Sequence, residues 1–156
     1  MFKNLKIHMI FLAVSFIFIQ TACAITLDEG KQAFQKYVKN SNACNMTFIN
    51  MYDKQSVIKR IVTNKDGSTY TKILPCAMYK TMLISYSQVA LIQGYSNVYT
   101  NVSFHQTGDD ITVKALRHPS TSQDRLPATI VFGKSSTGRI IVKEETFHTN
   151  AGFLIK

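Results

Sequence analysis

Several motifs that would assign an activity are absent from the sequence. No two histidines have the short spacing of a zinc motif such as H-x-x-x-H, and no G-x-S-x-G segment marks a nucleophilic serine. The chain also has no internal repeat and no low-complexity tract. These absences argue against a zinc site and a serine hydrolase, and we expect no cofactor. The 156 residues predict a single domain with a hydrophobic core.

Acidic residues are scarce, with 9 Asp and Glu against 18 Lys and Arg, so the formal net charge is +9. The lysines are scattered along the chain, and Lys59-Arg60 is the one adjacent pair of basic residues. A nucleic-acid-binding protein would typically cluster its cations with aromatic residues on one face. We therefore expect no nucleic-acid partner, and a basic surface that favours anionic partners or envelope lipids.

The first 24 residues have the pattern of a removable secretion signal. Lys3 and Lys6 precede an almost unbroken apolar run from Met9 to Ile19, and Ala22-Cys23-Ala24 fits a signal-peptidase site. The pattern predicts an exported protein, periplasmic or secreted, with cleavage after residue 24. Residues 25–156 would then form the mature domain.

Two alternatives to a cleaved signal remain. The first is an uncleaved membrane anchor, although the apolar run is short for a span of roughly 20 residues. The second is a lipid attached to Cys23, although Gln20 stands where a lipoprotein signal usually has leucine.

The cysteine count fits an exported protein. Of the three cysteines, Cys23 would leave with the signal, and Cys44 and Cys76 would remain in an oxidising compartment. We predict a disulfide between them, worth about 3–4 kcal/mol in the chain-entropy account. The alternative is two separate buried thiols.

The mature chain begins with a predicted amphipathic helix over Leu27 to Lys39. Thr26 is its expected N-cap, and Glu29, three residues on, completes a capping box. Apolar residues then recur at helical spacing, at Ala33, Phe34, Tyr37 and Val38. Asn40-Ser41-Asn42 should end the helix.

The next segments predict a short element, a hairpin and a long helix. Cys44 to Asp53 fits either a short second helix or a strand. Lys54 to Val62 and Thr69 to Leu74 read as strands, and Asn64-Lys65-Asp66-Gly67 supplies the hairpin turn. A helix should follow from Pro75 to Gly94, and its apolar residues predict the longest buried element.

The C-terminal part predicts four strands in an antiparallel meander, over Tyr99 to Gln106, Ile111 to His118, Ala128 to Gly133 and Arg139 to His148. In the second strand, period-two alternation places Ile111, Val113, Ala115 and Arg117 on one side, which should be buried. The whole order predicts an α+β fold in which helices pack on one face of a curved antiparallel sheet.

Four segments carry a resemblance to a known family: Met51-Tyr52-Asp53 before a strand, DGSTYTKI leading into the helix at Pro75, the opening of the meander from Gly94 to Tyr99, and its closing strand from Gly138 to Glu145. Across most of the mature chain, the sequence resembles the nuclear transport factor 2-like superfamily, which includes ketosteroid isomerase and the SnoaL-like proteins. The resemblance implies a cone whose sheet wraps a pocket closed by the helices. This scaffold hosts enzymes and also non-catalytic binding or assembly modules.

The resemblance to ketosteroid isomerase implies a carboxylate base, with a tyrosine and a protonated acid aimed at one oxyanion. Tyr37 and Asp53 are the nearest candidates for the tyrosine and the base. The strand from Tyr99 to Gln106 contains no acid, and Asp109-Asp110 belongs to a turn. This departure argues against isomerase chemistry and favours Asp53 as a turn or helix-end residue.

Arg117 and Glu144 are the remaining charged candidates for a site. On the last strand, Ile140, Val142 and Glu144 share one side, while Glu145 falls on the other. One glutamate could lie on the concave face with Arg117, as a structural ion pair or as a ligand anchor at a pocket mouth. Tyrosines would add apolar walls with hydroxyl tips, chiefly Tyr79 and Tyr99.

The sequence thus predicts an exported, non-catalytic binding or assembly module. Its partner would be a small apolar or anionic ligand in a pocket, or a protein docked through the sheet as a homodimer or an envelope complex. Two alternatives are a pocket enzyme of the isomerase or dehydratase type and an inhibitor or immunity protein.

Overall fold

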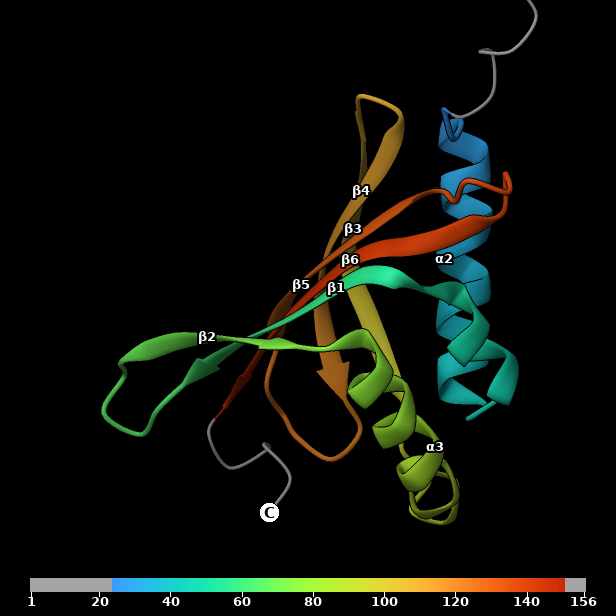
Figure 1. Ribbon diagram of the computed structural model, residues 1–156. Helices are drawn as coiled ribbons and strands as arrows, with labels where there is room; N and C mark the ends of the chain where they lie inside the picture. The colour runs from blue at the N-terminus through green and yellow to red at the C-terminus, as the bar shows by residue number, and fades with distance from the viewer. Residues whose placement is uncertain (1–23, 151–156) are drawn as a thin grey trace, which may run out of the picture.

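The computed structural model describes residues 24–150. Its elements are, in order, α2 (Leu27–Asn42), η1 (Met46–Met51), β1 (Tyr52–Thr63), β2 (Thr69–Leu74), α3 (Cys76–Ile92), β3 (Asn97–Thr107), β4 (Asp110–Pro119), β5 (Leu126–Lys134) and β6 (Ile140–Asn150). The strands form one curved sheet with helices against it (Figure 1), which confirms the α+β class. Residues 1–23 of the predicted 24-residue signal, with the alternative lipid site at Cys23, lie outside the described residues.

The sheet is mixed, with the strand order β2-β1-β6-β5-β4-β3. The predicted hairpin and meander are both present as antiparallel pairs, but β1 runs parallel to β6. A parallel pair needs a long crossover between its strands, and the segment from β2 through α3 to β5 supplies it. The expectation of a purely antiparallel sheet is therefore wrong for the β1–β6 pair. Strand periodicity carries no information about which strand lies beside β1.

The first helix, α2, begins where the capping box predicts. The Thr26 backbone N–H donates to Glu29 Oε2 at 2.8 Å, and the Glu29 N–H donates to Thr26 Oγ1 at 3.2 Å. Ala33, Phe34 and Tyr37 form its buried side, which packs across β3, β4 and β5. The predicted amphipathic helix is therefore confirmed, and it continues to Asn42.

The ambiguous segment after α2 is a short 3-10 helix, η1, followed directly by β1. Asn45 caps η1, because its side-chain oxygen accepts the Thr47 backbone N–H at 2.9 Å. Phe48 and Met51 are buried. The helical alternative for this segment is the one that the structure contains.

The second long helix, α3, is present as predicted but is largely exposed. Cys76 and Tyr79 are its buried residues, while Leu91 and Ile92 are 57% and 85% exposed. The expectation of a long buried element is therefore wrong, because the helix contacts β1 and η1 and most residues of its later turns are exposed. Within the described residues, no helix has the length and apolarity that crossing a membrane requires.

The predicted disulfide is not formed, since Cys44 and Cys76 are both free thiols. Cys76 is buried at the start of α3, where its thiol donates to the Asp53 carbonyl oxygen at 2.9 Å. Cys44 follows α2 in a left-handed backbone conformation with φ 48°. It lines a cavity that Cys76 does not line. The cysteine count alone could not show that the two sulfurs have different surroundings.

Gly30 packs tightly against the sheet. A Cβ at this position would lie 2.8 Å from two side-chain carbons of the fully buried Ile111. Helix propensity alone would make Gly30→Ala stabilising by about 1 kcal/mol, but the short contact would push α2 off β4. We expect Gly30→Ala to lower the free energy of unfolding in urea by about 1–3 kcal/mol.

The matched control is Gln32→Ala, at an exposed position of the same helix, which should change stability by about 0.5 kcal/mol or less. A Gly30→Ala protein as stable as the wild type would contradict the close packing of α2 on Ile111.

Candidate functional site

A cavity of about 700 Å³ lies between α3, η1 and the inner face of the sheet, a size typical of small-molecule sites. Four of the residues predicted as site candidates line it: Tyr37 from α2, Tyr79 from α3, Tyr99 from β3 and Arg117 from β4. Most of the remaining lining residues are apolar, and α3 contributes Met78, Met82, Leu83, Tyr86 and Val89 to them. Sequence candidates from four different elements thus meet in one pocket.

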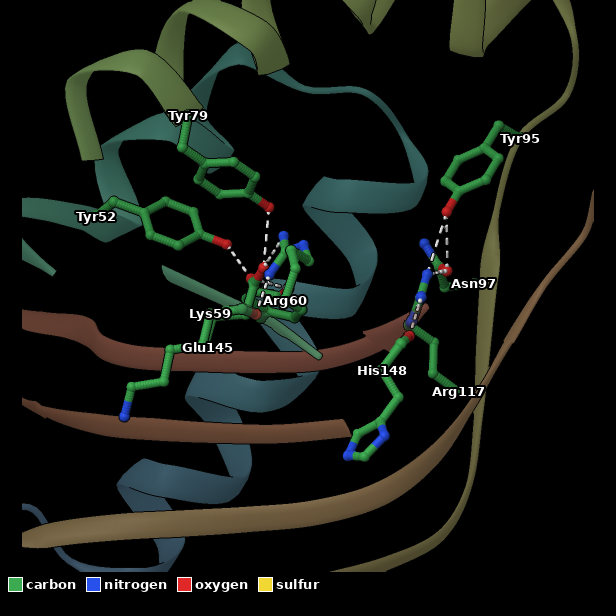
Figure 2. Close-up of polar contacts among 10 residues, drawn as sticks. Tyr52, Lys59, Arg60, Tyr79, Tyr95, Asn97, Arg117, Glu145 and His148 are labelled. Carbon is green, nitrogen blue, oxygen red and sulfur yellow. Dashed lines mark hydrogen bonds and ion pairs between the residues drawn. The ribbon is translucent and has the colours of Figure 1, made fainter. Parts of the chain in front are cut away.

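Beside the cavity, the fully buried carboxylate of Glu145 accepts four hydrogen bonds. On Oε2 it accepts from the hydroxyls of Tyr37 at 2.6 Å and Tyr52 at 2.5 Å. On Oε1 it accepts from Arg60 Nη2 at 2.6 Å and from the Tyr79 hydroxyl at 3.0 Å. Figure 2 shows Tyr52, Arg60 and Tyr79 converging on the side chain of Glu145. Both oxygens are therefore fully used by the protein itself.

This arrangement fixes the charge states of its members. Burial alone would raise the pKa of Glu145, but the Arg60 charge and the hydrogen bonds from Tyr37 and Tyr52 outweigh it and hold that pKa below its ordinary value. Burial, followed by the negative charge of Glu145, raises the pKa of Tyr37, Tyr52 and Tyr79. Near neutral pH the cluster is thus one carboxylate, one guanidinium and three neutral phenols.

Glu144, the glutamate predicted for the pocket, points the other way. Its carboxylate pairs with Lys59 at 2.9 Å, and both side chains are 33% exposed. The reason is an irregularity between β5 and β6: Val131 pairs with Glu144, and the next pair is Phe132 with Val142. Lys143 is the extra residue, which reverses the alternation, so Glu145 joins Val142 on the inner face.

Two guanidinium groups stack on one aromatic ring in the wall of the cavity. The Arg60 Cζ lies 5.0 Å from the ring centroid of Phe147, and the Arg117 Cζ lies 4.7 Å from it. Both contacts are within the range of cation–π attraction. The two cations differ in one respect, because Arg60 has a carboxylate partner in Glu145.

Arg117 is buried, as predicted, but its partners are all neutral. Its Nη1 donates to Asn97 Oδ1 at 3.0 Å and to the Tyr95 hydroxyl at 3.3 Å, and its Nη2 donates to the His148 carbonyl at 3.3 Å. Figure 2 shows the His148 ring turned away from this contact. The Arg117 Nε is buried and has no acceptor among the described residues, so the expected pairing with a glutamate does not occur.

The charged side chains that line the cavity are all cationic, namely Arg60, Lys72 and Arg117. Among the described residues, no Asp or Glu belongs to this lining. Because Glu145 already neutralises Arg60, the positive charge left over at the buried wall is that of Arg117. A negatively charged group entering the cavity would supply the counter-charge that Arg117 lacks among the described residues.

Asp53, the candidate base, does not reach this cavity. Its Oδ1 accepts the Gln55 backbone N–H at 3.0 Å, and its own backbone N–H donates to Ser56 Oγ at 2.8 Å. It lines a second, more polar cavity with Lys134 and Lys143. The placement agrees with the alternative role of a turn residue.

Three residues of the site were missed as candidates, namely Tyr52, Arg60 and Phe147, and Glu145 was considered beside Glu144 but not selected. A signal for Arg60 was present, because period-two alternation puts it on the same face of β1 as Ile58 and Val62, which are fully buried. An arginine between two core positions of one strand face predicts a buried cation. No such signal existed for Glu145, whose orientation depends on the bulge at Lys143.

Neither a protein-family model nor a curated protein sequence matches the chain. Solved structures do resemble it. A protein of unknown function from the DUF3225 family of Pectobacterium atrosepticum has a TM-score of 0.57 at 10% identity, and the match covers 78% of this chain and 88% of that chain.

Two further structures are similar. A nuclear transport factor 2-like protein with a cystatin-like fold from Novosphingobium aromaticivorans has a TM-score of 0.54 at 9% identity and covers 99% and 93% of the two chains. The β subunit of benzoate 1,2-dioxygenase from Burkholderia mallei has a TM-score of 0.54 at 11% identity and covers 85% and 96%. At this identity the likeness shows the fold alone: the chain has the nuclear transport factor 2-like fold that its sequence resemblance implied.

The Glu145 cluster should dominate the stability of the domain. Glu145→Gln leaves Arg60 without its counter-ion inside the protein, and we expect the free energy of unfolding in urea at neutral pH to fall by about 3–5 kcal/mol. Because the pKa of Glu145 lies below its ordinary 4.5 in the folded chain, the ionised carboxylate stabilises the fold above that pH. This contribution is lost as the pH falls through the folded pKa, so the wild type should lose stability in acid more steeply than the variant.

The adjacent change Glu144→Gln is the control. It removes a half-exposed ion pair with Lys59, and we expect it to cost about 1 kcal/mol or less. Equal effects of the two substitutions would show that Glu145 does not hold the structural position described.

Proposed function

We propose that the protein binds a small amphipathic anion in the cavity below α3, without chemical conversion. The observation that carries this proposal is the buried Arg117, whose charge has no carboxylate partner among the described residues. Buried charges are normally paired. An anionic headgroup would satisfy Arg117, and the apolar residues of α3 would cover the rest of the ligand.

The cluster around Glu145 favours binding over catalysis. A general base needs a free lone pair near the substrate and a pKa near the working pH. Glu145 has four donors on its two oxygens, and its pKa is lowered. No carboxylate lines the cavity within the described residues, so the isomerase or dehydratase alternative lacks a carboxylate general base there.

The proposal includes export. The pattern of Lys3, Lys6, the apolar run and Ala22-Cys23-Ala24 supports a cleaved signal. In that setting the ligands available to the cavity would include anionic amphiphiles of the cell envelope. The fold is similar to that of the β subunit of benzoate 1,2-dioxygenase. Assembly with a protein partner is therefore compatible with this fold.

A headgroup series tests the anion site. Decanoate, decanol and decylammonium have the same chain and differ in charge, so calorimetry should rank decanoate first and decylammonium last. Arg117→Gln should weaken decanoate binding about tenfold to a hundredfold, since a hydrogen bond to a charged group is worth about 1.5–3 kcal/mol. Decanol binding should change little.

Arg139→Gln is the matched control, because it removes the same charge from an exposed turn. Urea unfolding should confirm that both variants are folded. Equal affinity of the wild type for decanoate and decylammonium would sink the proposal whether or not Arg117→Gln folds.

A further inference from the structure

The helix α3 exposes an unusual amount of apolar surface. Ile84, Leu91 and Ile92 are 49%, 57% and 85% exposed, and none of them lines the cavity. A helix that is apolar around its whole circumference is normally buried on all sides. Figure 1 shows its first turn beside the β1–β2 hairpin and its later turns extending away from it. The outer side of α3 therefore calls for a cover that the described chain does not provide.

The outer side of α3 is continuous with the wall of the cavity. Met78, Tyr86 and Val89 line the cavity and are also 43%, 43% and 48% exposed. The same helix is thus the rim of the pocket and the apolar surface beside it. A ligand that leaves an apolar phase in contact with the outer side would reach the cavity by passing these three residues.

The charged side chains of α3 itself, and of β2 and β3 on either side of it in the sequence, have one sign. From Gly67 to Gly108, a stretch that contains β2, α3 and β3, the sequence has no Asp or Glu. Lys72 and Lys80 lie within it, and Lys72 also lines the cavity. An apolar surface flanked by cations alone is complementary to an anionic one. A second copy of this chain would instead bring like charges together across a symmetric contact.

We propose that the outer side of α3 docks on an anionic lipid surface and that the cavity takes its ligand, an acyl chain with an anionic headgroup, from that surface. The second half of this proposal rests on the proposed function of the cavity, whereas docking does not. Ile84, Leu91 and Ile92 enter the acyl boundary, Lys72 and Lys80 lie at the headgroups, and the headgroup of the captured lipid pairs with Arg117.

Vesicle sedimentation tests the docking. Two kinds of vesicle are used: phosphatidylcholine alone, and phosphatidylcholine in which a third of the lipid is replaced by phosphatidylglycerol. The protein without residues 1–24 should sediment with the second kind and much less with the first. The triple variant Ile84→Gln, Leu91→Gln, Ile92→Gln should lose about tenfold or more in partitioning, because each buried apolar side chain contributes to binding. Glutamine retains good helix propensity.

Leu27→Gln is the control, because Leu27 is 42% exposed at the start of the other helix and should leave partitioning unchanged. Decanoate binding in solution separates the two proposals. The triple variant should bind decanoate like the wild type, because its three residues lie outside the cavity. If the wild type does not bind decanoate, the proposed function of the cavity is refuted. Docking is then still tested separately by vesicle sedimentation.

Two results would overturn the docking proposal. One is partitioning of the folded triple variant equal to that of the wild type, including the case in which neither protein sediments with anionic vesicles. The other is a dimer in solution, seen by sedimentation velocity, that the triple variant loses while vesicle binding is absent, since a second copy would then cover α3.

Discussion

The buried carboxylate of Glu145 is the interaction on which the rest of the structure depends. Its four donors come from α2, from both ends of the long strand β1 and from α3, so one side chain of β6 joins every layer of the domain. Burying an isolated carboxylate would cost several kcal/mol. Here a guanidinium and three hydroxyls replace the lost water, and the lowered pKa of Glu145 shows that they more than offset the burial. We infer that the cluster serves mainly to fix where α3 sits.

The same cluster determines the character of the cavity. Phe147 lies between two guanidinium groups, and Glu145 can neutralise one of them. Arg60 is the one that it neutralises, because Ile58 and Glu145 pair across β1 and β6, and Arg60 is two residues further on the same face. Arg117 comes from β4, on the far side of β5, and it is left with neutral acceptors. The positive wall of the pocket therefore follows from the register of the sheet.

The sequence predicted those features that depend on local pattern. The capping box at Thr26, the strand Thr69–Leu74 and the buried side of β4 with Arg117 are all present. It could not predict the features that depend on contacts between distant segments. The bulge at Lys143 exchanges Glu144 for Glu145, the parallel pairing of β1 with β6 has no periodic signature, and the count of cysteines does not place two sulfurs together. The exposure of α3 was also hidden, because apolar residues at helical spacing look the same whether or not the protein itself covers them.

The exposure of α3 connects the pocket to the surface. At one end α3 is held by its first turn, where Cys76 bonds to the Asp53 carbonyl and Tyr79 to Glu145. At the other end, a turn at Gly94, with φ 63°, leads into a backbone bond from Ser120 to Ser96. Between these attachments the helix spans the cavity instead of filling it, so its apolar side chains face empty volume on one side and the exterior on the other. A helix of this composition is stable in such a place when something apolar occupies one or both sides. The ligand that we propose for the cavity and the lipid surface that we propose for the outer side of α3 would both meet this one physical requirement.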